Sequence, residues 1–311
     1  MSVFDKSLDG RSLYDIALET IRHYARNDGK NLVAFSGGKD SQVVLQLCKE
    51  AGIGYSAQYS ITRFEPPELL EFLKSHYPEV SIRRAYKRPL LSEIEYSGLP
   101  TRFTRWCCAA KHVATPGYPM AFIGVRGEES ARRRDTWRTF GRKRDGTYYC
   151  CPIFYWTAEN VWEFLDSRGL PHCKLYDEGH RRIGCVLCPL VSSPTIRQRD
   201  ATKWPKTAAM LRRGAEKFCA RMANQGHITK HGKQCPDWRC AANPSEEYFR
   251  RWAETGQTSF SVAEYAARFL ADYVIGKEIA NTQRLLFDLP MFGKSSEKLP
   301  NIGKATEGRS Q

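Results

Sequence analysis

The stretch from Ser36 to Ser41, which reads Ser-Gly-Gly-Lys-Asp-Ser, constrains the fold of this chain more than any other. It follows the short apolar run 31–35 and precedes residues 42–48, whose apolar side chains recur with helical spacing. A strand, a glycine turn and a helix start in this order form an anion site, because the helix N-terminus offers unpaired N–H groups and glycine lets a phosphate approach the backbone. The sequence therefore predicts a phosphate-binding loop here.

The side chains of the loop suit a nucleotide phosphate. Lys39 can add a point charge, and two serine hydroxyls can donate hydrogen bonds. The spacing differs from that of a Walker A loop, which has four residues between its first glycine and the Gly-Lys pair. Six loop residues are predicted to bind the phosphates of a nucleotide cofactor: Ser36, Gly37, Gly38, Lys39, Asp40 and Ser41. Lys39 is also a predicted catalytic residue, because its ammonium can stabilise negative charge on a phosphate.

Strand-like and helix-like segments alternate along the first two thirds of the chain. We expect strands at 31–35, 54–61, 80–84 and 121–125, and helices at 11–27, 67–76 and 157–166. This order predicts an α/β fold, a mostly parallel doubly wound sheet whose ligands bind beyond the carboxyl ends of the strands. From residue 196 only helices are expected. We predict an α/β domain at 1–195, a basic helical lobe at 196–290 and a flexible tail at 291–311.

The net charge of +14 is concentrated in two segments. Residues 102–144 hold eleven Lys and Arg against three acids, and residues 197–233 hold ten against two, so each carries +8. Two such clusters favour a polyanionic partner, with nucleic acid preferred over a smaller phosphorylated ligand and a solvated basic face as the alternative. Four interleaved aromatic residues could stack on bases or belong to the core: Trp137, Tyr148, Tyr149 and Trp204.

The chain offers no sign of a membrane partner. No apolar run approaches the roughly 20 residues of a membrane span. The N-terminus lacks the basic and apolar regions of a signal peptide. We expect a cytoplasmic protein.

Charged residues follow the predicted strand 121–125. At the carboxyl end of a parallel strand they can meet phosphates, and a carboxylate there can orient an arginine. We predict that Arg126 contacts the α-phosphate and acts in catalysis, with Glu129 orienting it; a surface salt-bridge cluster is the alternative. The predicted nucleotide contacts of this segment are Gly124, Arg126, Glu129, Ser130 and Arg133.

Eleven cysteines in a chain without a secretory signal indicate metal binding or redox chemistry rather than disulfides. Cys107 and Cys108 are adjacent, and Cys185 and Cys188 form a Cys-x-x-Cys turn. Four such thiolates suit an iron–sulfur cluster or zinc, and adjacent cysteines favour the cluster because neighbouring side chains diverge. Unligated thiols are the remaining alternative. We predict these four cysteines as metal ligands.

Other cysteines give weaker signals. Cys48, on the apolar face of the helix after the loop, is expected in the core. Cys151, next to Cys150, is a candidate for a sulfur relay. A further group has spacing that could suit zinc, with a mixed loop as the alternative: His227, His231, Cys235 and Cys240.

The ordered motifs carry a resemblance. After the glycine loop come 105–111 (Arg-Trp-Cys-Cys-Ala-Ala-Lys), 124–133, 151–157, 175–179 and 184–189 (Gly-Cys-Val-Leu-Cys-Pro). This series resembles the phosphoadenosine phosphosulfate (PAPS) reductase family of the PP-loop ATP pyrophosphatase superfamily. The resemblance implies an adenine nucleotide α-hydrolase-like fold, ATP with Mg²⁺ as cofactors, pyrophosphate release, and a [4Fe–4S] cluster on the four cysteines.

The match departs from the reductases in two places. Their C-terminal Glu-Cys-Gly-Leu-His segment, whose cysteine attacks the sulfonucleotide, is missing, since no cysteine follows Cys240. Their Asp-Thr turn after the second strand is replaced by residues 59–63. The sequence is therefore similar to the cluster-bearing DndC and SspD proteins of DNA phosphorothioation. In these proteins ATP activates a phosphate oxygen, which is replaced by sulfur from a cysteine desulfurase.

The leading hypothesis is ATP-dependent sulfur transfer to nucleic acid, with DNA favoured over tRNA and a cysteine desulfurase as donor. Three alternatives remain: a sulfonucleotide reductase that uses Cys235 or Cys240 as the attacking thiol, a tRNA thiolation enzyme, and a non-catalytic DNA-binding regulator.

Overall fold

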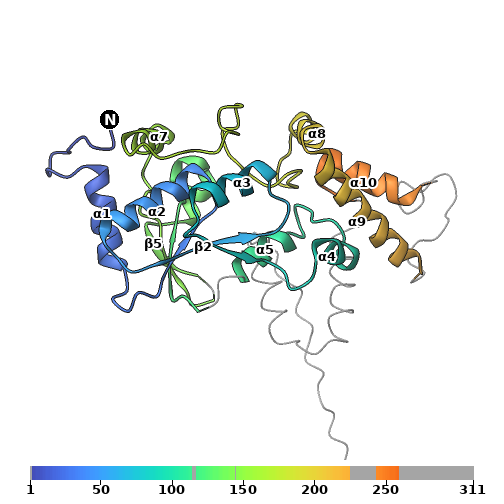
Figure 1. Cartoon of the computed structure of the whole chain (residues 1–311), viewed down its shortest axis with the longest axis horizontal. Helices are drawn as coiled ribbons and strands as arrows, with labels where there is room; N and C mark the ends of the chain where they lie inside the picture. The colour runs from blue at the N-terminus through green and yellow to red at the C-terminus, as the bar shows by residue number, and fades with distance from the viewer. Residues whose placement is uncertain (1, 114–116, 144, 225–242, 259–311) are drawn as a thin grey trace, which may run out of the picture. The chain divides into compact units, whose positions relative to one another are not determined.

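The computed structural model describes residues 2–113, 117–143, 145–224 and 243–258 (Figure 1). The chain divides into two compact units after residue 259, and all described residues belong to the first. Among the described residues, no helix combines the length and apolar character needed to cross a membrane.

A six-stranded sheet, in the order β3-β2-β1-β4-β6-β5, forms the centre of this unit. β1 (Asn31–Ala34) lies between β2 (Ser56–Ile61) and β4 (Met120–Ile123), and both neighbours run parallel to it. β3 (Ser81–Arg84) and β6 (Tyr148–Cys150) extend the parallel pairing, and β5 (Phe140–Arg142) is an antiparallel edge strand. The predicted mostly parallel α/β sheet is confirmed. The strands β5 and β6 were not predicted.

Helices connect the strands. Their bounds are α1 (Leu13–Tyr24), α2 (Lys39–Ala51), α3 (Pro67–His76), α4 (Leu90–Ser97), α5 (Trp106–Val113), α6 (Ala131–Thr136) and α7 (Ala158–Ser167), with a short 3₁₀ turn η1 (Gly127–Glu129). α1 is shorter than the predicted 11–27 at both ends: a capping box between Ser12 and Asp15 fixes its start, and the extended backbone at Ala25 ends it. α3 has the predicted bounds, and Thr157 caps α7 with Asn160 in the expected box.

The core surrounds the helix that follows the glycine loop. α2 packs on β1 and β4, and α1 and α7 pack on α2 (Figure 1). Val33 of β1, Val44 of α2 and Phe122 of β4 are fully buried. The predicted core position of Cys48 is confirmed, since this side chain has no exposed surface.

Three further helices follow: α8 (Pro194–Lys203), α9 (Pro205–Asn224) and α10 (Pro244–Thr255). α4 packs along α9 (Figure 1), and the Leu99 N–H donates to the Tyr248 hydroxyl at 2.9 Å. The Trp252 indole N–H donates to the Pro100 carbonyl at 2.5 Å. These helices therefore pack on residues that precede the predicted domain boundary at 195. The boundary itself stays a prediction. The remainder of the predicted lobe and the tail at 291–311 lie outside the described residues.

Candidate active site

The glycine loop closes on itself at the N-terminus of α2. Gly37 has a φ of +74°, and a Cβ there would lie 2.7 Å from the Leu69 Cδ1, so this position needs glycine. The Ser36 N–H donates to the Ser41 Oγ at 3.1 Å, and the Ser41 hydroxyl donates to the Gly38 carbonyl at 2.8 Å. The resulting turn places the first N–H groups of α2 where an anion could approach them.

Tyr176 covers one side of this turn and was missed by the sequence analysis. The Lys39 N–H donates to the Tyr176 hydroxyl at 3.0 Å, and the Lys39 Nζ lies 5.7 Å from the centre of the same ring. Burial raises the pKa of Tyr176 to about 12, so the phenol stays neutral near pH 7. Its sequence signal is the motif 175–179 that contains it, but its contact with a loop more than a hundred residues away becomes visible only in the fold.

Asp40 joins the two predicted catalytic cations. Its carboxylate lies 3.2 Å from the Lys39 Nζ and 2.5 Å from the Arg126 Nε. Arg126 is 3% exposed, and its Nη1 donates to Glu128 at 2.5 Å and to the Trp156 carbonyl at 3.4 Å. The structure thus brings Lys39 and Arg126 together, but the Arg126 guanidinium is bonded to protein acceptors.

The predicted orientation of Arg126 by Glu129 is wrong. The Glu129 carboxylate accepts only the backbone N–H of Arg126, at 3.4 Å, and it forms ion pairs with Arg133 and with Arg182, the latter at 3.9 Å. Asp40 and Glu128 hold the guanidinium instead, because the strand end places Arg126 directly over the start of α2.

Gly124 and Ser130 have local roles. A Cβ at Gly124 would lie 2.8 Å from the backbone carbon and oxygen of Asp40, so glycine here lets the end of β4 touch the start of α2. Ser130 caps α6 by accepting the Arg133 N–H at 3.2 Å. Burial, with repulsion from Arg182 and Arg126, lowers the pKa of Arg133 to about 10. Because Arg133 and Arg182 share the one carboxylate of Glu129, their combined charge leaves positive potential beside the loop.

The four predicted metal ligands come from two separate segments. Cys107 and Cys108 lie on α5, and Cys185 and Cys188 lie in the turn before α8. The Lys111 Nζ of α5 lies 3.8 Å from the Cys185 Sγ. After the hydrogen bond with Cys108 and burial, the charges of Cys185 and Cys188 also raise the pKa of Cys107, so the two segments lie within electrostatic range of each other.

A carboxylate anchors Lys111 beside the thiols. Glu65 is 5% exposed and lies 3.1 Å from the Lys111 Nζ. Its oxygens accept the Thr62 N–H at 3.1 Å and the Thr62 hydroxyl at 2.6 Å. The Val186 N–H donates to the Phe64 carbonyl at 2.6 Å. The segment after β2 therefore contacts the cysteine turn directly, a link that the sequence analysis missed.

The thiols influence one another's protonation. A hydrogen bond between Cys107 and Cys108 raises the pKa of Cys107 and lowers that of Cys108, where Lys111 and Arg105 also favour the thiolate. Burial raises the pKa of Cys185 to about 12, although Lys111 opposes this shift. The group can therefore hold a thiolate at Cys108, while its neighbours need a cation or a metal to ionise.

This donor set fits a thiolate-bound cluster chemically. The donors are four soft sulfurs from two segments, with Lys111 beside Cys185, and the buried hydroxyls of Tyr59 and Tyr86 have no hydrogen-bond partner. Burial and the charges of Glu65 and nearby cysteines raise the pKa of both phenols, which places these hydroxyls by the thiols. In the described part of the chain, no three His, Cys, Asp or Glu side chains are arranged to hold a single metal ion.

The remaining sequence predictions have mixed outcomes. Cys151 is fully buried and packs with Val125, Tyr149 and Phe154, so no sulfur acceptor reaches it in this arrangement. Trp204 is 6% exposed and donates to the Glu68 carboxylate at 2.9 Å. Trp137 packs edge-on against Tyr149 at 4.8 Å, and Tyr148 is 42% exposed. The predicted zinc group, His227, His231, Cys235 and Cys240, lies outside the described residues.

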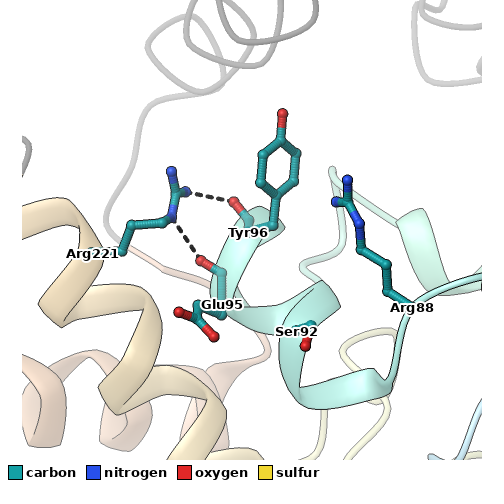
Figure 2. Close-up of a pocket in the computed structure, with 5 residues that line it drawn as sticks. All are labelled: Arg88, Ser92, Glu95, Tyr96 and Arg221. Atoms are coloured by element: carbon teal, nitrogen blue, oxygen red, sulfur yellow. Dashed lines mark hydrogen bonds between the residues drawn. The ribbon is translucent and has the colours of Figure 1, made fainter. Parts of the chain in front are cut away.

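An open cleft of about 250 Å³ lies between α4 and α9 (Figure 2). Figure 2 shows Tyr96 with an arginine on either side, and the Arg88 and Arg221 guanidinium carbons lie 5.1 and 5.4 Å from the centre of its ring. The Arg221 Nε donates to the Glu95 carbonyl at 2.8 Å. This cleft shares no residue with the loop or with the cysteine group.

Fold and site together define the class: a mostly parallel α/β protein with a glycine-rich loop at the carboxyl end of its central strand and a cysteine group at the same edge. Residues 30–191 match the model of the phosphoadenosine phosphosulfate reductase domain. The chain belongs to this family. The finer resemblance to the DNA phosphorothioation branch stays a prediction.

The chain is similar to several known proteins. An uncharacterized protein of Methanocaldococcus jannaschii is 33% identical over 207 residues, which cover 60% of this chain and 42% of that protein. An adenosine 5'-phosphosulfate reductase of Oceanobacillus iheyensis is 31% identical over 46% of this chain and 62% of its own length. The chain thus spans less than two thirds of either relative. A phosphoadenylyl-sulfate reductase of Candida auris, solved as a phosphate complex, is 14% identical, covers 60% of this chain and 98% of its own, and has a TM-score of 0.37.

Proposed function

We propose that this chain reduces an adenylyl sulfate to sulfite and AMP. The observation that carries the proposal is that the glycine turn and the cysteine pairs lie at the same edge of the sheet. The turn follows β1, and Glu65, which holds Lys111 beside Cys185, follows the neighbouring strand β2. Relatives named adenosine 5'-phosphosulfate reductase support this substrate class over a nucleic acid.

The loop would bind the phosphate of the sulfonucleotide. The N–H groups at the start of α2 and the Lys39 ammonium supply positive potential there. Arg133 and Arg182, which share Glu129, would meet the remaining oxygen charge. Arg126 would act as a positioning residue through Asp40, because its guanidinium is already bonded.

The four cysteines would hold a [4Fe–4S] cluster close to the sulfate. When bound, the cluster would supply an electrostatic environment that stabilises charge developing on the sulfonucleotide. Lys111 would balance the charge of the coordinating thiolates, since its ammonium lies 3.8 Å from the Cys185 Sγ and is shared with Glu65.

The reaction needs a nucleophilic thiol. A thiolate attacks the sulfur of the adenylyl sulfate, the bond from sulfur to the phosphate oxygen breaks, and AMP leaves with the electron pair. A dithiol such as reduced thioredoxin then releases sulfite and closes a disulfide, so two electrons pass from thiols to sulfur. Cys235 or Cys240 would supply the first thiol.

The test is an assay of anaerobically purified protein with adenosine 5'-phosphosulfate and reduced thioredoxin. We expect sulfite and AMP in equal amounts, and loss of sulfite in Cys185→Ser. A protein with Cys235→Ser and Cys240→Ser together should bind the sulfonucleotide and release no sulfite. Sulfite release that persists in this double variant would remove those thiols from the mechanism.

A second function has an observation in its favour. In the described part of the chain, the five cysteines outside the proposed cluster are all at most 4% exposed: Cys48, Cys150, Cys151, Cys173 and Cys219. Together with the net charge of +14, this favours ATP-dependent sulfur transfer to nucleic acid, with Mg²⁺-bound ATP in the loop and an external sulfur donor. This function predicts that the protein releases pyrophosphate from ATP only when DNA and a cysteine desulfurase are both present. The same assay with tRNA in place of DNA tests the alternative of a tRNA thiolation enzyme.

A further inference from the structure

Arg197 of α8 is fully buried, which is rare for an arginine without a carboxylate partner. Its Nε donates to the Ala253 carbonyl at 2.8 Å, and its Nη2 donates to the Trp252 carbonyl at 2.6 Å. Its Nη1 donates to the carbonyls of Leu187 at 3.2 Å and of Cys188 at 2.5 Å. One guanidinium therefore joins the Cys-x-x-Cys turn to the C-terminal end of α10.

The turn that Arg197 holds is strained. Leu187, between the two cysteines, has a φ of +54°, a left-handed conformation that non-glycine residues rarely adopt. Its side chain is fully buried, and its carbonyl is one of the Arg197 acceptors. Such a conformation persists only where the surroundings enforce it. On the other side, the Val186 N–H bonds to the Phe64 carbonyl.

The contacts continue past the second cysteine. The Arg102 Nε donates to the Pro189 carbonyl at 3.1 Å. Gly256, which ends α10 with a φ of +70°, approaches the same residue so closely that a Cβ would lie 2.6 Å from the Pro189 oxygen. The helices α8 and α10 therefore pack against the cysteine turn.

The charge of Arg197 has no carboxylate bonded to it. All four of its hydrogen-bond acceptors are neutral carbonyls, and the nearby Asp200 pairs with Arg199 at 3.2 Å. The guanidinium carbon lies 5.1 Å from the centre of the Trp252 ring, so four carbonyl dipoles and an aromatic face meet this buried charge, but no bonded anion does. Cysteines bind metals as thiolates, so a loaded centre would place negative charge beside this guanidinium.

We propose that Arg197 is a positioning residue for the metal centre: it fixes the conformation of the Cys185–Cys188 turn and balances the charge of the thiolate-bound metal. The inference rests on the proposed cysteine centre. It assigns to α8 and α10 a role in retaining the metal, through the bonds to Leu187, Cys188 and Trp252.

The experiment compares the full chain, purified anaerobically, with Arg197→Gln, Arg197→Lys and the control Arg212→Gln. Arg212 is an exposed arginine of α9 that pairs with Glu246, so its loss changes the net charge equally. Two quantities are measured: the rate at which a chelator removes iron, followed by visible absorbance, and the midpoint potential in a redox titration. Neither depends on turnover.

We expect Arg197→Gln to lose iron about 10- to 100-fold faster, the usual effect of removing a partner of a metal ligand. Its midpoint potential should become more negative, because the reduced centre carries more negative charge and loses a nearby cation. Arg197→Lys should keep the potential but lose iron faster, since an ammonium cannot reach four carbonyls. Arg212→Gln should match wild type in both.

Two failures are distinguishable. Wild-type release and wild-type potential in both Arg197 variants would overturn the inference and leave the metal centre standing. Wild-type protein that carries no iron would overturn the centre and this inference with it. If Arg197→Gln does not fold, the release rate of Arg197→Lys decides between the outcomes.

Discussion

At the scale of single residues, the carboxylate of Asp40 is the link between the buried cations of the site. It contacts both Lys39 and Arg126, which are 5% and 3% exposed. Asp40→Asn should lower the free energy of unfolding by about 2–4 kcal/mol, because it leaves buried cations without their shared partner. Urea unfolding checks this, with the exposed Asp166→Asn of α7 as control. Equal stability of the two variants would contradict the account.

Gly124 gives a second prediction at this scale. Gly124→Ala should destabilise the fold by about 1–3 kcal/mol, because its Cβ would meet the Asp40 backbone at 2.8 Å and push the strand end away from the loop. Gly184→Ala is the control, since a Cβ at that position meets no atom within 4 Å. Thermal unfolding and equilibrium binding of the nucleotide measure both effects. A Gly124→Ala protein that binds AMP like wild type would show that the contact is dispensable.

At the scale of elements, α2 and α7 are joined by an ion pair with a defined pH dependence. The Arg168 Nε lies 2.9 Å from Glu50, and its guanidinium lies 5.0 Å from the Phe164 ring centre. Burial raises the pKa of Glu50, but hydrogen bonds from Arg168, Gln46 and Tyr14 outweigh it, so the pKa lies below the ordinary 4.5. A lowered pKa means that the stabilisation is present above pH 4.5 and is lost as the pH falls below it.

Glu50→Gln should therefore cost about 1–2 kcal/mol at pH 7 and progressively less in acid. Urea unfolding of wild type and variant across this range measures the difference. A difference that stays constant down to about pH 3 would assign the effect to packing rather than to charge.

Elements with local signals could be predicted, and contacts between distant segments could not. The Pro66-Pro67 pair and the capping box at Thr157 fixed the starts of α3 and α7. β5 and β6 are three residues each, and a charged stretch separates them, so no alternation identified them. The partners of Arg126 depend on how β4 meets α2, which a sequence does not reveal. Local spacing identified each cysteine pair, Cys107 with Cys108 and Cys185 with Cys188, and the resemblance to a known family joined the two pairs into one predicted site.

At the scale of the whole molecule, the described helices after residue 194 share a core with the sheet domain. Trp252 is fully buried and donates to Pro100, and Tyr248 accepts from Leu99. Trp252→Ala should lower the free energy of unfolding by about 3–5 kcal/mol within a single transition. Fluorescence and circular dichroism should follow one curve, and the exposed Arg250→Ala should unfold like wild type. Two separated transitions would instead make the helices an independent lobe.

The central proposal, the reduction of an adenylyl sulfate, rests on the family and on the glycine turn and cysteine pairs at one edge of the sheet. The most direct measurement is the yield of sulfite and AMP from adenosine 5'-phosphosulfate, with anaerobically purified protein and reduced thioredoxin. The account predicts equal amounts of both products and none of either from Lys39→Ala or Cys185→Ser. An iron-loaded protein that forms no sulfite, yet releases pyrophosphate from ATP when DNA and a sulfur donor are present, would contradict it.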